Sequence, residues 1–142
     1  MIEFTHILKD AGLVAADAAG QVDSSNVIVE LGTGLVEGNL VIDVTAIEVA
    51  DGDENYQISL QGSSQSDFSY DYKDLTILEL GAFETLGGDQ DSSSAEDSTT
   101  GRYIVPFRTE RNGTTYQYVR VYCDVSGTIA TGINYSAHLA KK

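Results

Sequence analysis

Residues 102–125 read RYIVPFRTERNGTTYQYVRVYCDV, and this stretch carries the strongest β-sheet signal in the chain. Asn112-Gly113 lies between two runs that are rich in β-branched and aromatic residues, which is the best short-range indicator of a two-residue type I′ hairpin. The turn places Arg111 opposite Thr114 and extends the pairing outward along both runs. We therefore expect one long antiparallel hairpin over this stretch.

This pairing also predicts which side chains share each face of the hairpin. One face carries Ile104, Pro106, Val119, Val121 and Cys123, and the other carries Tyr103, Val105, Phe107, Tyr116, Tyr118, Arg120 and Tyr122. Both faces are too apolar to be fully hydrated, so one is expected in the core and the other against a second surface. Interface energy tends to concentrate at Tyr and Arg. The residues predicted to contact a partner or a second protomer are therefore Tyr103, Phe107, Tyr116, Tyr118, Arg120 and Tyr122. Alternatively, the tyrosines cover the core and point their hydroxyl groups to solvent.

The rest of the chain also favours strands over helices. It contains 14 Gly, eight Tyr, one Pro and no Trp, and its turn signals recur about every 8–12 residues, which is typical of an all-β sandwich or barrel. Further strands are expected at Val27–Leu31, Leu40–Val49, 56–61, Leu75–Leu80 and Ile129–Leu139.

Two of these strands carry finer information. The apolar positions of Leu40–Val49 shift by one residue between Val44 and Ile47, which predicts a β-bulge. Leu75–Leu80 is apolar at both odd and even positions, which predicts a strand that is covered on both faces.

A chain of 142 residues and 15.2 kDa fits one domain. We expect an N-terminal arm over residues 1–25, in which the Ala-rich stretch Asp10–Gly20 is either a short helix or extended, followed by a β-sandwich domain over 26–142. Residues 87–101 read GGDQDSSSAEDSTTG and predict an exposed, mobile acidic loop.

The charge of the chain bears on its partners. The formal net charge is −14, and it is uneven: residues 1–100 hold 20 acids and two bases, a sum of −18, whereas residues 101–142 hold two acids and six bases, a sum of +4. Such a chain repels phosphate backbones and anionic lipid surfaces, so neither nucleic acid nor a membrane is an expected partner. No run of 18 apolar residues and no signal peptide are visible, so a soluble domain made inside a cell is expected.

No motif in the chain predicts catalysis, a cofactor or a metal. The only histidines, His6 and His138, lie in no recognisable catalytic motif, so an enzyme is not expected. Two acidic groups could bind calcium, Asp51, Asp53 and Glu54 in one turn and Asp89, Asp91, Glu96 and Asp97 in the loop, but neither has calcium-loop spacing, so no metal is expected. Cys123 alternates with Val121 and Val125 and is predicted to be a small buried hydrophobic residue.

Four segments in order along the chain carry a family resemblance. They are NVIVELG at 26–32, the strand pair 40–49 and 56–63, YQYVRVYCDV at 116–125 and SGTIATGINYSA at 126–137. This pattern resembles the capsid cement (decoration) proteins of tailed bacteriophages, whose type member comes from a Bordetella phage. The acidic stretch 87–101 departs from the family pattern.

The resemblance implies a jelly-roll-like antiparallel β-sandwich on the outer surface of the virion, made in the cytoplasm of the bacterial host. There it would bind the major capsid protein and, as a homodimer or homotrimer, cement neighbouring capsid subunits against the pressure of the packaged DNA. Two alternatives stay open. The first is a carbohydrate- or receptor-binding β-sandwich module on the virion. The second is an acidic-site hydrolase, which would need two carboxylates about 5–9.5 Å apart in a cleft.

Overall fold

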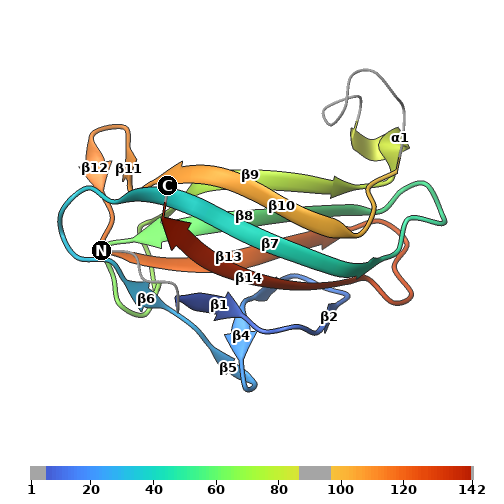
Figure 1. Cartoon of the computed structure of the whole chain (residues 1–142), viewed down its shortest axis with the longest axis horizontal. Helices are drawn as coiled ribbons and strands as arrows, with labels where there is room; N and C mark the ends of the chain where they lie inside the picture. The colour runs from blue at the N-terminus through green and yellow to red at the C-terminus, as the bar shows by residue number, and fades with distance from the viewer. Residues whose placement is uncertain (1–5, 87–96, 142) are drawn as a thin grey trace.

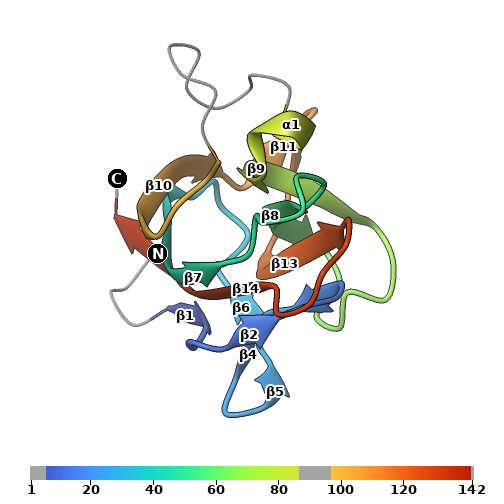
Figure 2. The same ribbon diagram turned by 90° about the vertical axis from the view of Figure 1, so that its right-hand side faces the viewer.

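The computed structural model describes residues 6–86 and 97–141. These residues form two five-stranded antiparallel sheets that pack face to face (Figures 1 and 2). Sheet I has the order β1 (Ile7–Lys9), β14 (Ile133–Lys141), β7 (Glu37–Ile47) and β10 (Gly101–Arg108), with β2 (Leu13–Val14) also on β14. Sheet II has the order β3 (Ala18–Ala19), β13 (Tyr118–Ser126), β8 (Asn55–Ser63) and β9 (Tyr72–Gly81), with β6 (Val29–Glu30) also on β13. The all-β antiparallel sandwich predicted from the sequence is confirmed.

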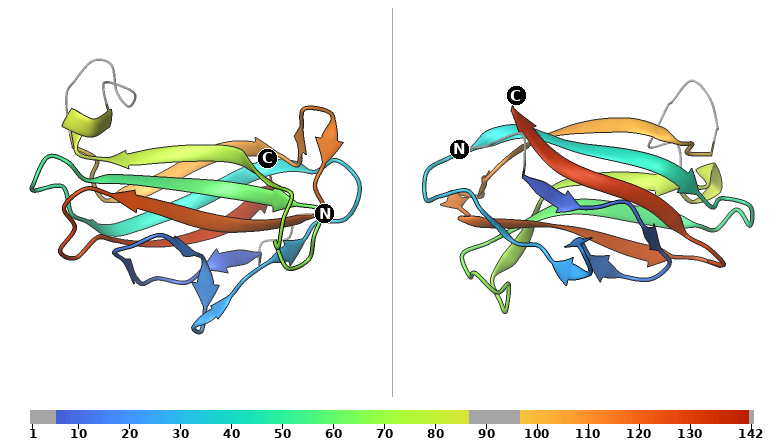
Figure 3. Two further views of the ribbon diagram at one scale, coloured as in Figure 1. Left: turned by 180° about the vertical axis from the view of Figure 1, so that it is seen from behind. Right: turned by 60° about the horizontal axis from the view of Figure 1, so that its bottom comes forward.

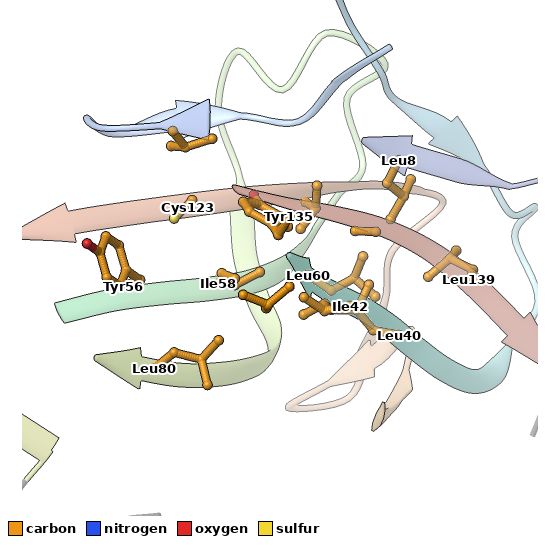
Figure 4. Close-up of a cluster of buried hydrophobic side chains, with 14 of the residues drawn as sticks. Leu8, Leu40, Ile42, Tyr56, Ile58, Leu60, Leu80, Cys123, Tyr135 and Leu139 are labelled. Atoms are coloured by element: carbon orange, nitrogen blue, oxygen red, sulfur yellow. The ribbon is translucent and has the colours of Figure 1, made fainter. Parts of the chain in front are cut away.

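The core lies between the two sheets and is filled by alternate side chains of the long strands. Leu40 and Ile42 of β7 face Ile58 and Leu60 of β8, and all four are fully buried (Figure 4). Cys123 of β13 is also fully buried, as predicted, and burial raises the pKa of its thiol to about 12.

The Asn112-Gly113 turn is confirmed, but the long hairpin is wrong. The short strands β11 (Glu110–Arg111) and β12 (Thr114–Thr115) pair in the expected register, with Arg111 opposite Thr114. Beyond Thr109 the two arms of the turn separate, because β10 pairs with β7 in sheet I whereas β13 pairs with β8 in sheet II. The turn is therefore a corner between the sheets.

The predicted faces of this hairpin fail for the same reason. On β10 the positions of Tyr103 and Phe107 face the core, whereas Ile104 points outward and is 59% exposed. On β13 the residues that face the core, including Val119 and Val121, belong to the predicted face that also held Ile104. Because β10 and β13 lie in different sheets, each has its own core-facing side. The faces of one continuous hairpin therefore do not describe both strands.

The two finer strand predictions have different outcomes. In β7 the register against β14 skips Thr45, because Val44 pairs with Tyr135 and Ala46 with Asn134, so the predicted bulge is confirmed. Leu75–Leu80 is not covered on both faces: β9 is an edge strand that pairs with β8, and Ile77 is 45% exposed. A bulge at Leu75, between the pairs Gln61–Asp74 and Leu60–Thr76, explains why apolar residues occur at both parities.

The N-terminal segment is extended rather than helical and bridges the sheets along one edge of the sandwich (Figure 3). β1 and β2 pair with β14, and β3 pairs with β13. The chain then forms the small hairpin of β4 (Gln21–Val22) and β5 (Ser25–Asn26). Between β3 and β4, Gly20 donates its N–H to the carbonyl of Val121 at 2.8 Å, and a Cβ at this position would collide with Val121 and with the Leu8 carbonyl. The described part of the predicted arm, residues 6–25, thus lies against the sandwich.

At the opposite end, β9 runs into the four-residue helix α1 (Phe83–Leu86). Most of the predicted mobile loop, residues 87–96 with Asp89, Asp91 and Glu96, lies outside the described residues. Its last part is ordered, because Ser98 is buried and exchanges two hydrogen bonds with the backbone of Gly81. Across the described residues no helix has the length and apolar character needed to cross a membrane.

Candidate contact surface

The outer face of sheet II, whose strands β9, β8 and β13 face the viewer in Figure 3 (left), carries a cluster of aromatic side chains around one arginine. We call this cluster the aromatic face. Its members come from β13, from β9 and from the connection between β8 and β9, and they are Tyr118, Arg120, Tyr122, Tyr72, Ile77 and Phe68. The period of two along β13 produces this arrangement, since Val119, Val121 and Cys123 point into the core and their neighbours point outward.

The strand register aligns these residues in rows. Tyr118 lies opposite Ser63, which lies opposite Tyr72, and in the next row Arg120 lies opposite Gln61, which lies opposite Asp74. The small and polar side chains of β8 thus lie between the Tyr118–Arg120–Tyr122 column of β13 and the Tyr72 end of β9.

Arg120 is stacked within this cluster. Its guanidinium carbon lies 4.5 Å from the ring centre of Phe68, 5.3 Å from that of Tyr122 and 5.4 Å from that of Tyr72. Its Nε donates a hydrogen bond to Oε1 of Gln61 at 2.9 Å. Three rings and one hydrogen bond therefore fix the side chain before any partner arrives.

The electrostatics of Arg120 are unusual for so acidic a chain. Partial burial lowers the pKa of its guanidinium, while Tyr72 and Tyr122 oppose that shift. In the described part of the chain, the ion pairs are Arg102–Asp43, Arg108–Glu37 and Arg108–Glu110, and none involves Arg120. Arg120 is thus a pre-positioned cation, and no carboxylate of the described residues lies in ion-pair range of it.

The connection between β8 and β9 is folded against this cation. Phe68 is only 5% exposed although its φ of 54° is in the left-handed region that bulky residues rarely adopt. Its N–H bonds the carbonyl of Gln65, and the next N–H, of Ser69, bonds the carboxylate of Asp67. Contact with Arg120 holds a backbone conformation that would otherwise be disfavoured.

The six residues predicted to contact a partner do not form one surface. Tyr118, Arg120 and Tyr122 lie together on the aromatic face, but Phe107 and Tyr116 are buried, at 5% and 4% exposure. Tyr103 packs partly on the core from sheet I and donates its hydroxyl to the carbonyl of Thr99. The aromatic face also contains Phe68 and Tyr72, which the prediction missed. Their signal was the aromatic run FSYDY at 68–72 in a segment otherwise typical of a turn.

The acidic turn considered for calcium uses its carboxylates for the backbone. Glu54 is fully buried and accepts the N–H groups of Asp51 and Gly52 at 2.8 and 2.9 Å. Asp53 accepts the N–H and hydroxyl of Thr128, and these hydrogen bonds lower the pKa of its carboxyl group. The carboxylates of Glu48, Asp51 and Glu54 come within 4.8 Å of one another. No other feature of this turn points to a cation.

The neighbouring Glu48 also binds the backbone, by accepting N–H groups of residues 130–132 in the loop between β13 and β14. These bonds, above all that of Gly132, lower the pKa of the Glu48 carboxyl group. Glu48 and Asp53, both in the connection between β7 and β8, therefore hold it against the loop between β13 and β14 at one end of the sandwich.

A shallow pocket of about 300 Å³ lies beside the aromatic face. It is lined by Gln61, Tyr72, Lys73, Asp74, Ile77 and Arg111. An exposed aromatic ring next to an acid and two bases is the type of surface that binds polar ligands such as sugars.

The chain matches no protein-family model and no curated protein. What the fold and this surface define is a small antiparallel β-sandwich with one aromatic, arginine-containing face.

Proposed function

We propose that the protein is a structural virion protein that binds the outer surface of a phage head. In this role it cements neighbouring major capsid proteins and stabilises the capsid against internal DNA pressure. The observation that carries the proposal is the aromatic face, in which a stacked Arg120 is surrounded by partly exposed tyrosines. The resemblance of its strand segments to capsid cement proteins, which implies a jelly-roll-like sandwich, supports the same role.

Such a role needs affinity and no chemistry. A protein that binds the assembled lattice but not the free subunits stabilises the lattice by mass action, by about 2.7 kcal/mol per site when its free concentration is a hundred times Kd. Interface energy concentrates at a few Tyr and Arg side chains that are desolvated on contact. A pre-positioned Arg120 between tyrosines supplies such a group with little further loss of conformational entropy.

The charge of the chain agrees with this location. A net charge of −14 disfavours contact with the packaged genome and keeps the solvent-facing surface soluble. The partners in this proposal are the major capsid protein and further copies of the chain itself, without nucleic acid or membrane. The protein would be made in the cytoplasm of the host cell and would act on the virion surface.

The test is the disassembly temperature of empty shells of the phage that encodes the protein, with and without added protein. We expect wild type to raise this temperature and the double variant Tyr118→Ala/Tyr122→Ala to lose most of the effect while staying folded. The control is Leu13→Ala/Ile104→Ala, which removes two exposed apolar side chains of sheet I. An equal effect of both double variants would exclude the aromatic face as the contact.

The second candidate is a carbohydrate- or receptor-binding module on the virion. The pocket lined by Tyr72 and Asp74 is the observation that favours it. A glycan array distinguishes the two candidates: saturable glycan binding that is lost in Tyr72→Ala, together with no effect on shells, would favour the second.

A further inference from the structure

Three of the eight basic side chains of the protein lie at the pocket beside the aromatic face. Lys73 and Arg111 line this pocket, and Arg120 lies in the strand row of Gln61 and Asp74, which also line it. Within residues 6–86 and 97–141, none of these three bases belongs to an ion pair. The pocket therefore concentrates positive charge on a chain whose net charge is −14.

The other described bases are used elsewhere in the fold. Lys9 is buried and donates hydrogen bonds to three backbone carbonyls. Arg102 and Arg108 are held in ion pairs, and Lys141 ends β14 at the edge of the described chain. This contrast marks the pocket as the place where an anionic group of a partner finds cations that the fold itself does not neutralise.

Arg111 is already oriented for such a group. Its Nη1 donates a hydrogen bond to the main-chain carbonyl of Asp74 at 2.7 Å, which ties the corner turn to β9. This bond uses one of the five N–H groups of the guanidinium, and Arg111 makes no further hydrogen bond to the described residues. The remaining N–H groups can hold both oxygens of a carboxylate, the geometry that a guanidinium favours.

The formal charge of the pocket fits a single carboxylate. Lys73 and Arg111 contribute +2 and Asp74 contributes −1, so the lining residues sum to +1. A carboxylate balances this charge, whereas a phosphate monoester, with about −1.5 to −2 at pH 7, exceeds it.

The acids nearest to the pocket leave this balance largely intact. Glu79 and Asp124 lie two rows further along the strands, about 13 Å away. This separation exceeds the Debye length of about 8 Å at physiological ionic strength, so their repulsion is screened. Asp67 and Asp71 accept hydrogen bonds within the connection between β8 and β9, and neither lines the pocket.

From these contacts and charges we infer that the pocket receives an acidic side chain of the protein bound on the aromatic face, with its carboxylate paired to Arg111 and Lys73. The inference rests on the proposed function, because it names the chemistry of the surface that the aromatic face contacts. The pocket and the aromatic face are continuous, since Gln61, Tyr72 and Ile77 take part in both. Contact across the aromatic rings excludes water from the charge pair, which strengthens it and fixes the orientation of the partner.

Co-sedimentation of the full chain with empty, expanded shells of its own phage tests the inference. We expect Lys73→Gln/Arg111→Gln to raise Kd about tenfold, with circular dichroism unchanged from wild type. The matched control is Lys141→Gln/Arg102→Gln, which removes one exposed lysine and one exposed arginine of sheet I and should leave Kd unchanged. Asp74→Asn removes the acid of the pocket and should lower Kd about threefold, an effect that misfolding cannot produce.

Four results would overturn the inference, and they separate it from the proposed function. Wild-type Kd in Lys73→Gln/Arg111→Gln, together with loss of binding in Tyr118→Ala/Tyr122→Ala, would reject the acidic contact and keep the proposed function. An equal loss in the matched control would assign the effect to net charge alone. Saturable binding of free glucuronic acid that is lost in the pocket variant, with shell binding unchanged, would assign the pocket to an acidic sugar. A wild-type chain that binds no shells would refute the proposed function and the inference together.

Discussion

Replacing Arg120 by Ala should destabilise the fold and release the connection between β8 and β9. The side chain makes three cation–π contacts at 4.5–5.4 Å, each contributing about 0.5–1 kcal/mol at a partly exposed site. Its hydrogen bond to Gln61 adds about 1 kcal/mol. The desolvation that lowers its pKa offsets part of this sum, so we expect a loss of about 2 kcal/mol in the free energy of unfolding.

The effect should be local as well as global. Phe68 keeps its left-handed conformation while it packs against Arg120. Removal of the Arg120 side chain should therefore raise amide hydrogen exchange in residues 64–71. Urea unfolding measures the free energy, and exchange mass spectrometry measures the connection. Arg120→Lys keeps the charge but not the planar stack and should lose nearly as much stability.

The control is Arg108→Ala, which removes an arginine of sheet I with a 53% exposed side chain and ion pairs of 3.5 and 3.9 Å. Such pairs contribute little, so a loss below about 0.5 kcal/mol is expected. If Arg120→Ala cost no more than this control, or left exchange in residues 64–71 unchanged, the stacked arginine would not organise the aromatic face.

Three further predictions concern the core. Burial raises the pKa of Cys123 from 9.0 to about 12, so the folded chain keeps a proton that the unfolded chain loses. The free energy of unfolding should therefore fall by up to about 4 kcal/mol as pH rises through this window. In urea titrations from pH 7 to 11, Cys123→Val should lack this part of the alkaline loss, and a pH profile identical to that of wild type would refute the prediction. The Tyr135 hydroxyl is buried without a hydrogen-bond partner, so Tyr135→Phe should raise stability by about 1 kcal/mol, whereas a decrease in the thermal midpoint would show that the hydroxyl is bonded. Gly20→Ala would force a Cβ against Val121 and the Leu8 carbonyl and should cost at least about 2 kcal/mol, and a wild-type melting temperature would contradict the close approach.

The sequence predicted the elements better than their partners. Apolar alternation identified the long strands, the Asn112-Gly113 signal identified the turn but not that it is a corner between the sheets, and the parity shift after Val44 identified a bulge, because these signals are local. Which strand pairs with which depends on contacts distant in sequence, such as β10 with β7, and no local signal encodes that choice. This is why Phe107 and Tyr116 were assigned to a contact surface although they are buried.

The candidate surface was half predictable for the same reason. Tyr118, Arg120 and Tyr122 share one face because they alternate within a single strand. Phe68 and Tyr72 join them only because the connection between β8 and β9 folds back over Arg120, and this depends on a left-handed residue in the connection. The edge position of β9 was also hidden, because a bulge at Leu75 placed apolar residues at both parities.

Co-sedimentation of the purified protein with empty, expanded shells of its own phage, scored for bound stoichiometry, tests the central claim most directly. The proposed function predicts saturable binding at a fixed whole-number ratio to the major capsid protein, abolished by Tyr118→Ala/Tyr122→Ala. No binding to expanded shells at saturating protein concentrations would contradict it.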